Sequence, residues 1–198
     1  LDFEGLRILS AVAFSILTLL LCVLCYKKLG FAVIVAMLVS LVGTSVGIAT
    51  QSISTIVTFF IAIIASIYIL ARYPKIKNFP ILFLVIGACT CFFDLLTTPL
   101  VTFGIPAVFY FLEKQQQRET TLKEEIIDFL KIGIAWVAGF AILWITKWII
   151  TDVLYGRNLI EIGLGQVGYR MSGEIEQINL WQEFIIVLKQ NFYYLTNV

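Results

Sequence analysis

The stretch from Leu29 to Ala71 contains 43 residues and no charged side chain. At a rise of about 1.5 Å per residue, a single helix of this length would measure about 64 Å, roughly twice the ~30 Å hydrocarbon core of a bilayer. The chain must therefore turn back within the stretch. A polar cluster at 50–55 can satisfy free backbone groups at an interface, so we expect the turn there, between helices at 30–49 and 55–71.

The composition supports a membrane protein throughout. Of the 198 residues, 60% are apolar and 14% are charged, whereas soluble domains carry about 25% charged residues. A net charge of +1 provides no basic field for nucleic acid. The chain has no histidine, which excludes Ser-His-Asp catalysis and His-ligated metals from these residues. We expect an all-α fold, a polytopic transmembrane helical bundle of about six hydrophobic segments.

Runs almost free of charge predict the spans, which are 8–26, 30–49, 55–71, 79–93, 95–112 and 132–150. Residues 121–131 and 158–172 are expected at the interface, and 181–198 is expected to begin a further span. Residues 1–198 are interpreted as one transmembrane domain. Because the chain starts with Leu1 rather than Met, we expect it to be a fragment of a longer protein.

The run 79–112 contains one charged residue, Asp94. A single helix over this run would measure about 51 Å, which is too long even when tilted. A break between Asp94 and Pro99 leaves helices at 79–93 and 95–112, about 22 Å and 27 Å long, and both are short for a full crossing. The lengths predict a broken hairpin of short helices.

Basic residues predict the orientation of the spans, because cytoplasmic loops carry an excess of lysine and arginine. With the hairpin, nine basic residues share one side: Lys27, Lys28, Arg72, Lys75, Lys77, Lys114, Arg118, Lys123 and Lys131. The other side holds Arg7, Arg157 and Arg170. A single crossing by 79–112 would reduce the split to seven against five. The hairpin therefore places residue 1 and the Asp94 tip outside a bacterial cytoplasmic membrane.

Asp94 is the leading candidate for a functional residue, because carboxylates within membrane segments are rare and usually functional. Thr97 and Thr98 follow it, where the next helix starts, and hydroxyls at a helix N-terminus can bind anions. The alternative is that Asp94 only caps that helix in a hydrated turn. The two interpretations have equal weight on the sequence alone.

Lys147 lies between two tryptophans near the outer end of its predicted span. Its ammonium group can extend to lipid headgroups, which is the simpler interpretation. Alternatively it can bind a lipid phosphate beside Asp152 and Arg157.

Two other motifs do not support a site. Residues 163–168 match G-x-G-x-x-G but follow a membrane span rather than a strand, so no nucleotide cofactor is expected. Cys22 with Cys25, and Cys89 with Cys91, lie inside apolar segments, where thiolates are disfavoured. They are interpreted as packing residues.

The stretch Cys91-Phe-Phe-Asp-Leu-Leu-Thr-Thr-Pro-Leu-Val-Thr-Phe-Gly-Ile-Pro106, with Trp144-Ile-Thr-Lys-Trp148 downstream, resembles a group of polytopic membrane proteins of Gram-positive bacteria. That group is similar in layout to membrane-embedded glycosyltransferases of envelope polysaccharide assembly, which use polyprenyl-phosphate sugars at the outer face. The resemblance covers residues 79–172. Those enzymes carry an acidic catalytic residue in their first extracytoplasmic loop. No such motif is present here, and it would have to precede Leu1.

The resemblance implies an integral membrane protein of the cell envelope, glycosyltransferase-like and acting on lipid-linked sugars. Asp94 would be catalytic by orienting sugar hydroxyls or a divalent metal, and Thr97, Thr98, Lys147 and Arg157 would bind substrate or lipid phosphate. The expected partners are the bilayer and a polyprenyl-phosphate-linked sugar. Two alternatives remain open, a transporter or flippase whose site is the broken hairpin, and a non-catalytic membrane subunit. Whether the protein is an enzyme is left open.

Overall fold

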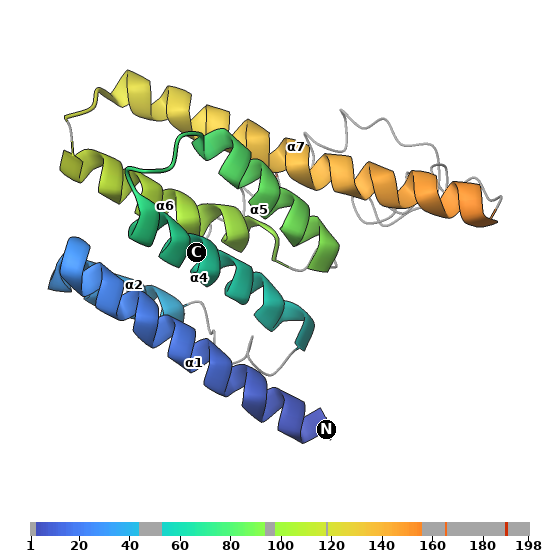
Figure 1. The fold of residues 1–198 in the computed structure, drawn as a ribbon, viewed down its shortest axis with the longest axis horizontal. Coiled ribbons are helices and arrows are strands. Elements are labelled where there is room, and N and C mark those ends of the chain that lie inside the picture. The colour runs from blue at the N-terminus through green and yellow to red at the C-terminus, as the bar shows by residue number, and fades with distance from the viewer. Residues whose placement is uncertain are drawn as a thin grey trace. The chain divides into compact units, whose positions relative to one another are not determined.

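A computed structural model describes residues 3–43, 53–93, 98–117 and 119–155, with the single residues 165 and 189. The chain divides into two compact units, Leu1–Trp144 and Ile145–Val198, and each is described by itself. The described residues are all-α. Their helices are α1 (Phe3–Lys28), α2 (Phe31–Gly43), α4 (Ile53–Arg72), α5 (Phe79–Phe93), α6 (Leu100–Gln117) and α7 (Leu122–Tyr155) (Figure 1).

Three of these helices are long and apolar enough to cross a membrane: Glu4–Lys28, Thr55–Arg72 and Leu122–Leu154. The shorter apolar helices are Phe31–Val42 and Phe79–Phe93. The expected fold class, an all-α bundle of about six hydrophobic segments, is therefore confirmed, and the chain is a multi-pass membrane protein.

The turn between α1 and α2 is compact because Gly30 adopts a left-handed conformation, with φ of 93°. The amide groups of Leu29 and Gly30 both donate to the carbonyl oxygen of Cys25, at 2.7 and 3.0 Å. This is the usual way for a helix to end at a glycine, since only glycine adopts that conformation without steric cost. The predicted span 30–49 corresponds to α2 up to Gly43, and residues 44–52 lie outside the described part.

The hairpin helices begin at recognisable caps. The side-chain oxygen of Asn78 accepts a hydrogen bond from the amide of Ile81 at 3.3 Å, and α5 has the predicted bounds. At the second helix, the carbonyls of Thr98 and Pro99 accept hydrogen bonds from the amides of Val101 and Thr102. Proline has no N–H group to lose, which favours a helix start there. Helix α6 continues beyond the predicted end of its span, to Gln117.

Helix α7 joins the expected interfacial segment 121–131 and the expected span 132–150 into one continuous α-helix. Its start carries the helix-capping pattern Thr121-Leu-Lys-Glu124. The hydroxyl of Thr121 accepts a hydrogen bond from the amide of Glu124 at 3.4 Å, and the Thr121 carbonyl accepts one from Glu125.

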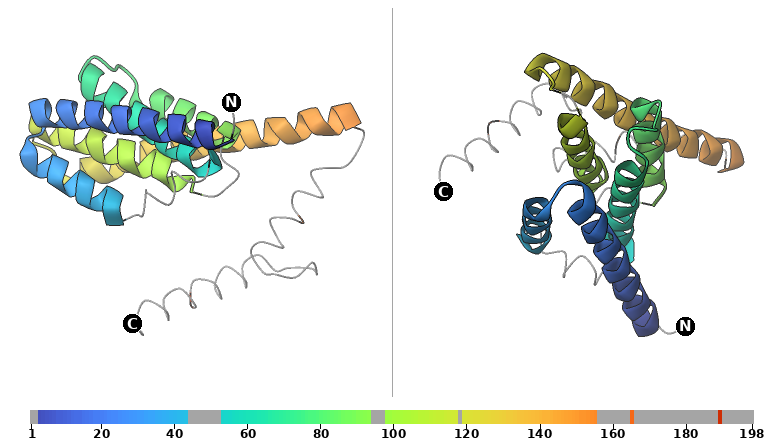
Figure 2. Two further views of the ribbon diagram at one scale, coloured as in Figure 1. Left: turned by 90° about the horizontal axis from the view of Figure 1, so that it is seen from below. Right: turned by 60° about the vertical axis from the view of Figure 1, so that its left-hand side comes forward.

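The first unit has α4 at its centre. Half of the most apolar window of α4 is buried within the protein, compared with 17% for α1 and for α7. One group of buried residues joins α4 to α1 and α6, and includes Leu21, Ile63 and Phe109. A second joins α4 to α5, α6 and α7 through Ile69, Phe83, Ile132 and Trp136. Figure 2 shows the helices of this unit running side by side.

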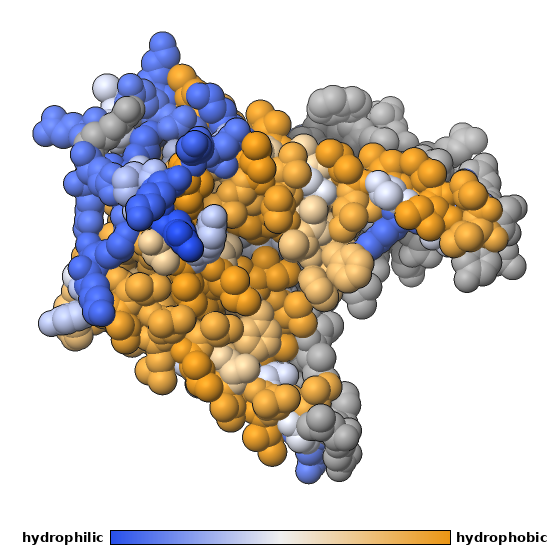
Figure 3. Space-filling view, in the orientation of Figure 1, coloured by the Kyte–Doolittle hydropathy of each residue, from blue (hydrophilic) through white to orange (hydrophobic). Residues whose placement is uncertain are grey.

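The outside of the first unit is largely apolar. Large hydrophobic side chains are exposed on every described helix of this unit, among them Ile8, Leu19, Val42, Ile81 and Ile134. In water, molecules with such a surface would associate with one another, whereas in a membrane lipid chains can cover it. Figure 3 shows apolar residues over most of one face and hydrophilic residues gathered at one end.

The polar end confirms the hairpin. Helices α1, α4 and α6 finish there, and α5 and α7 begin there (Figure 1). The contacts agree with this arrangement. The ring centroids of Phe79, at the start of α5, and Tyr110 are 4.4 Å apart, and Nζ of Lys28 lies 3.3 Å from Oε1 of Glu113. The described members of the predicted basic side therefore share one end of the bundle: Lys27, Lys28, Arg72, Lys75, Lys77, Lys114, Lys123 and Lys131.

Candidate functional site

Of the residues predicted to form a site, Asp94, Thr97 and Arg157 lie outside the described part of the chain. Thr98 lies immediately before α6, in the first unit, and its hydroxyl donates to the hydroxyl of Thr58 on α4 at 3.5 Å. Lys147 is half-buried on α7, in the second unit, and its backbone carbonyl accepts a hydrogen bond from the Thr151 hydroxyl at 2.7 Å. The site predicted from sequence is thus only partly described.

Helices α5 and α7 cross at two glycines. A Cβ atom on Gly87 would lie 2.0 Å from the carbonyl oxygen of Trp136, and one on Gly139 would lie 2.0 Å from the carbonyl oxygen of Leu84. The contact is reciprocal, with a glycine of each helix against the backbone of the other. Small residues at a crossing let two backbones approach closely, a common feature of helix packing in membranes. The crossing holds α7 against the hairpin.

Beside this crossing, a buried polar cluster joins three helices. The hydroxyls of Thr90 on α5 and Thr102 on α6 are 2.7 Å apart, and the indole N–H of Trp136 on α7 donates to Thr102 at 3.2 Å. Both threonines are fully buried. Such groups within a membrane protein require partners, because an unpaired polar group in an apolar setting costs several kcal/mol, roughly 2–7.

The cluster has fewer protons than contacts. The Thr90 hydroxyl also lies 2.7 Å from the Ile86 carbonyl, and the Thr102 hydroxyl lies 2.8 Å from the Pro99 carbonyl. Each hydroxyl donates only one proton, so the two cannot serve both carbonyls and each other at once. Rotation of the hydroxyls therefore gives two arrangements, with either Thr90 or Thr102 donating across the hairpin. Trp136 donates in both.

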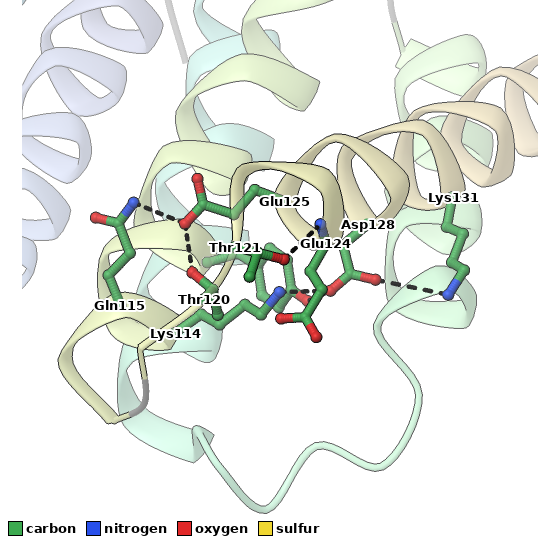
Figure 4. A network of polar contacts seen from close by, with 9 residues as sticks. Lys114, Gln115, Thr120, Thr121, Glu124, Glu125, Asp128 and Lys131 are labelled. Atoms are coloured by element: carbon green, nitrogen blue, oxygen red, sulfur yellow. Dashed lines mark hydrogen bonds and ion pairs between the residues drawn. The ribbon is translucent and has the colours of Figure 1, made fainter.

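A second polar network occupies the polar end of the bundle, where the basic residues gather and which we call the lysine-rich end (Figure 4). The ammonium group of Lys114 on α6 donates to Oδ2 of Asp128 on α7 at 2.6 Å, and the Tyr110 hydroxyl lies 3.4 Å from the same oxygen. Lys131 lies 3.6 Å from Oδ1 of Asp128. The Lys114 side chain is 7% exposed and that of Asp128 is 27% exposed. This partly buried ion pair therefore holds α6 and α7 together.

The loop between α6 and α7 is bound to the same network. Glu125 accepts hydrogen bonds at Oε1 from the Gln115 amide at 3.0 Å and from the Thr120 hydroxyl at 2.5 Å. Figure 4 shows these side chains converging from both helices and from the loop. The network holds the end of α6 against the start of α7.

Glu113, the residue before Lys114, faces the opposite neighbour. It is only 3% exposed, and its Oε1 lies 3.3 Å from the ammonium group of Lys28 on α1. That contact is an ion pair without hydrogen-bond geometry, and this oxygen receives no hydrogen bond from the described residues. Two adjacent residues of α6 therefore form ion pairs of opposite sense. The carboxylate of Glu113 pairs with α1, and the ammonium group of Lys114 pairs with α7.

Sequence analysis did not predict the buried threonine cluster or the charged network. The signal for the network was present, because Glu113 and Lys114 directly follow an apolar run and Asp128 lies opposite the apolar face that Leu122, Ile126 and Leu130 form on the next helix. The signal for the cluster was weaker, since single threonines are common in membrane helices.

Apolar cavities open between the helices of the first unit. One of about 410 Å³ lies between α2 and α6, and Ser40 is the polar residue among its lining residues, which include Ala36, Met37, Ile105 and Phe109. It has the chemistry of a groove for a hydrocarbon chain.

The described cysteines are all free, and Cys25 and Cys91 are buried. Within the described ranges, no three of the Cys, Asp and Glu side chains are grouped closely enough to hold a metal ion. Asp94, which would orient the divalent metal that the resemblance implies, lies outside these ranges.

Comparison of the chain with protein-family models, with curated proteins and with solved structures gives no match. The class of the protein therefore follows from its own fold, a multi-pass α-helical membrane protein with a short hairpin held by a buried polar cluster.

Proposed function

We propose that the protein belongs to the bacterial cytoplasmic membrane and acts on polyprenyl-phosphate-linked sugars at the outer face, as a glycosyltransferase-like protein of envelope polysaccharide assembly. The lysine-rich end would face the cytoplasm, and residue 1 and the hairpin turn would face outward. The apolar groove between α2 and α6 is the observation that carries the proposal, because a polyprenyl chain consists of hydrocarbon alone. The second hairpin helix borders the groove through Ile105, Phe109 and Leu112, and the predicted site precedes this helix in the sequence.

The groove can be tested by filling it. Ala36 lines the groove, so Ala36→Trp should strongly reduce labelling by a photoreactive polyprenyl phosphate in membranes. Val35→Trp, on the same helix and outside the groove lining, is the matched control. Detergent size-exclusion chromatography checks that both variants fold. Equal labelling of the two variants would remove this support.

Catalysis can be tested at Asp94, with Asp94→Asn in the full-length protein and a polyprenyl-phosphate hexose as donor. Asparagine caps helices about as well as aspartate, so the fold should persist while turnover falls to a small fraction. Glu4→Gln, an exposed carboxylate at the end of α1 away from the lysines, should keep normal turnover. Normal turnover by Asp94→Asn would reassign Asp94 as a helix cap.

A transporter or flippase is the second candidate, and the buried polar cluster of Thr90, Thr102 and Trp136 favours it. A transporter needs polar groups inside the bundle, and two short helices often form its binding site. Proteoliposomes distinguish the candidates. Movement of a fluorescent lipid-linked sugar between leaflets without sugar transfer, lost in Thr102→Val, would establish the transporter.

A further inference from the structure

A polar cavity of about 330 Å³ opens at the lysine-rich end, apart from the hairpin turn and from the apolar groove. Three parts of the chain surround it. Lys77, Asn78 and Phe79 come from the loop and the start of α5, Tyr110 comes from α6, and Asp128 and Lys131 come from α7. Because these parts are far apart in sequence, the cavity exists only in the assembled bundle.

The charge in and beside the cavity is positive. Lys77 is exposed, and Lys131 is 62% exposed and lies 3.6 Å from Asp128, so both ammonium groups are at the cavity and open to a ligand. The carboxylate there, Asp128, is held by Lys114 at 2.6 Å. In the lining, two lysines against one aspartate leave an excess of positive charge, and the N-terminus of α5 contributes a further partial positive charge. An anion therefore fits this cavity.

The cavity lies at the boundary between polar and apolar parts of the bundle. Helix α4 ends at Arg72 and α5 begins at Phe79, so the loop between them marks the end of two apolar segments. The rings of Tyr73, Phe79 and Tyr110 pack together there, with centroids 4.4 to 6.4 Å apart. Aromatic side chains collect at the headgroup level of membranes. Phe79 and Ile132 provide an apolar wall to the same cavity.

We propose that this cavity binds the phosphate of an anionic phospholipid headgroup, with Lys77 and Lys131 facing the phosphate oxygens and Phe79 and Ile132 contacting the start of the acyl chains. Basic pockets between membrane helices on the cytoplasmic side have the chemistry for such headgroups. A free phosphate would match the lysines equally but would leave the apolar wall unused. The site does not depend on the activity proposed above, and only its cytoplasmic placement rests on the orientation proposed there.

The test compares two double variants of the full-length protein purified in detergent. Lys77→Gln with Lys131→Gln removes the two lysines that line the cavity. Lys75→Gln with Lys123→Gln removes two exposed lysines of the same end that do not line it. Both lose the same charge, so general attraction to anionic lipid is matched. Native mass spectrometry measures binding of phosphatidylglycerol, phosphatidylcholine and inorganic phosphate, and size-exclusion chromatography confirms folding.

We expect phosphatidylglycerol to bind the original protein and the Lys75/Lys123 variant tightly, and to bind the Lys77/Lys131 variant about 30-fold more weakly. Phosphatidylcholine should bind all three weakly. An equal loss in both variants would show that overall charge, not the cavity, attracts the lipid, and would overturn the proposal. Lysine-dependent binding of inorganic phosphate as tight as that of phosphatidylglycerol would assign the cavity to a free anion and overturn the lipid assignment.

Discussion

Gly87 and Gly139 lie where a single methyl group has no room. Each would place a Cβ atom 2.0 Å from a carbonyl oxygen of the facing helix, and the obstacle is backbone, which cannot rotate away as a side chain can. Glycine is therefore required at both positions for α5 and α7 to cross at their present distance.

Gly139→Ala should lower the stability of the protein by at least about 2 kcal/mol, because the helices must separate to relieve the clash. For a chain of this size, that corresponds to a fall in Tm of roughly 4–8 °C. Thermal stability by fluorescence-detected size-exclusion chromatography measures the change.

Gly104→Ala is the matched control for this prediction. Gly104 lies inside α6, and a Cβ atom there would meet nothing within 4 Å. Alanine is a better helix former than glycine by up to about 1 kcal/mol, so Tm should stay the same or rise. If both variants had the same Tm, the close crossing of α5 and α7 would be wrong.

Thr102→Val should destabilise the protein by about 1–3 kcal/mol, because it removes the acceptor of the buried Trp136 N–H and the partner of Thr90 without changing the side-chain shape. Thr58→Val, equally buried, removes a hydroxyl that donates within its own helix to the Thr55 carbonyl and accepts a long hydrogen bond, 3.5 Å, from Thr98, so it should cost less. Thermal unfolding of the two variants in the same detergent provides the comparison. A larger loss for Thr58→Val would contradict the role given to the cluster.

At the scale of elements, α6 forms ion pairs with two neighbouring helices, α1 and α7. Glu113 faces Lys28 on α1, and Lys114 faces Asp128 on α7. The two residues are adjacent in the chain and both are buried, so neither charge is easily hydrated if its partner is lost. These ion pairs differ in this respect from the exposed pairs of soluble proteins, which contribute about 0–1 kcal/mol.

The two members of the Lys114–Asp128 pair should respond unequally to substitution. Asp128→Leu leaves a lysine that is 7% exposed without its carboxylate, and should cost about 2 kcal/mol. Lys114→Met should cost less, since Asp128 is 27% exposed and keeps Lys131 at 3.6 Å. Chemical denaturation in mixed micelles measures both.

The double variant, Lys114→Met with Asp128→Leu, sharpens this prediction. Apolar replacement of both members removes the unpaired charge, so the double variant should be more stable than Asp128→Leu alone. Additive losses would show that the two side chains do not act as a pair.

At the scale of the whole molecule, the hairpin decides which loops face the same side. Single cysteines at Lys75 and Gln116, introduced into a cysteine-free background, should react from the same side of the membrane, and a cysteine at Glu4 should react from the other. The reason is that α4 and α6 both end where α1 ends. Labelling with an impermeant maleimide in intact cells and in inverted vesicles measures this. Reaction of Lys75 and Gln116 positions from opposite sides would exclude the hairpin.

Length and charge were sufficient to predict the hairpin and the bounds of α5, but not that α6 runs from Leu100 to Gln117 or that α7 is one helix from Leu122 to Tyr155. A charge-free run of 43 residues is too long for one span, and so is the run of 34 residues whose one charged residue is Asp94. The thickness of a bilayer therefore requires the chain to reverse direction within each run. The bounds of α5 follow in the same way, since a basic loop precedes it and a polar turn follows it.

The contacts between helices could not be predicted in this way, because they depend on which faces meet. Nothing in the composition of α5 and α7 marks Gly87 and Gly139 as opposite each other, and hydrophobic periodicity is weak in helices that are apolar on every side. The pairing of Thr102 with Trp136 has the same origin, since it depends on how α6 and α7 rotate about their axes. The predicted residues Asp94, Thr97 and Arg157 lie outside the described part, so their roles stay predictions.

The adjacent charges of α6 also have a consequence during synthesis. Lys28 is translated long before Glu113, so the partner of this carboxylate is already present when Glu113 is added. Lys114 emerges next, but its partner Asp128 is translated fourteen residues later, so the ammonium group must first find water or headgroups. Lys114 can therefore be buried as an ion pair only after the start of α7 has been synthesised. The Lys114–Asp128 ion pair is therefore formed later in synthesis than the Glu113–Lys28 pair, and α7 completes the charge balance of α6.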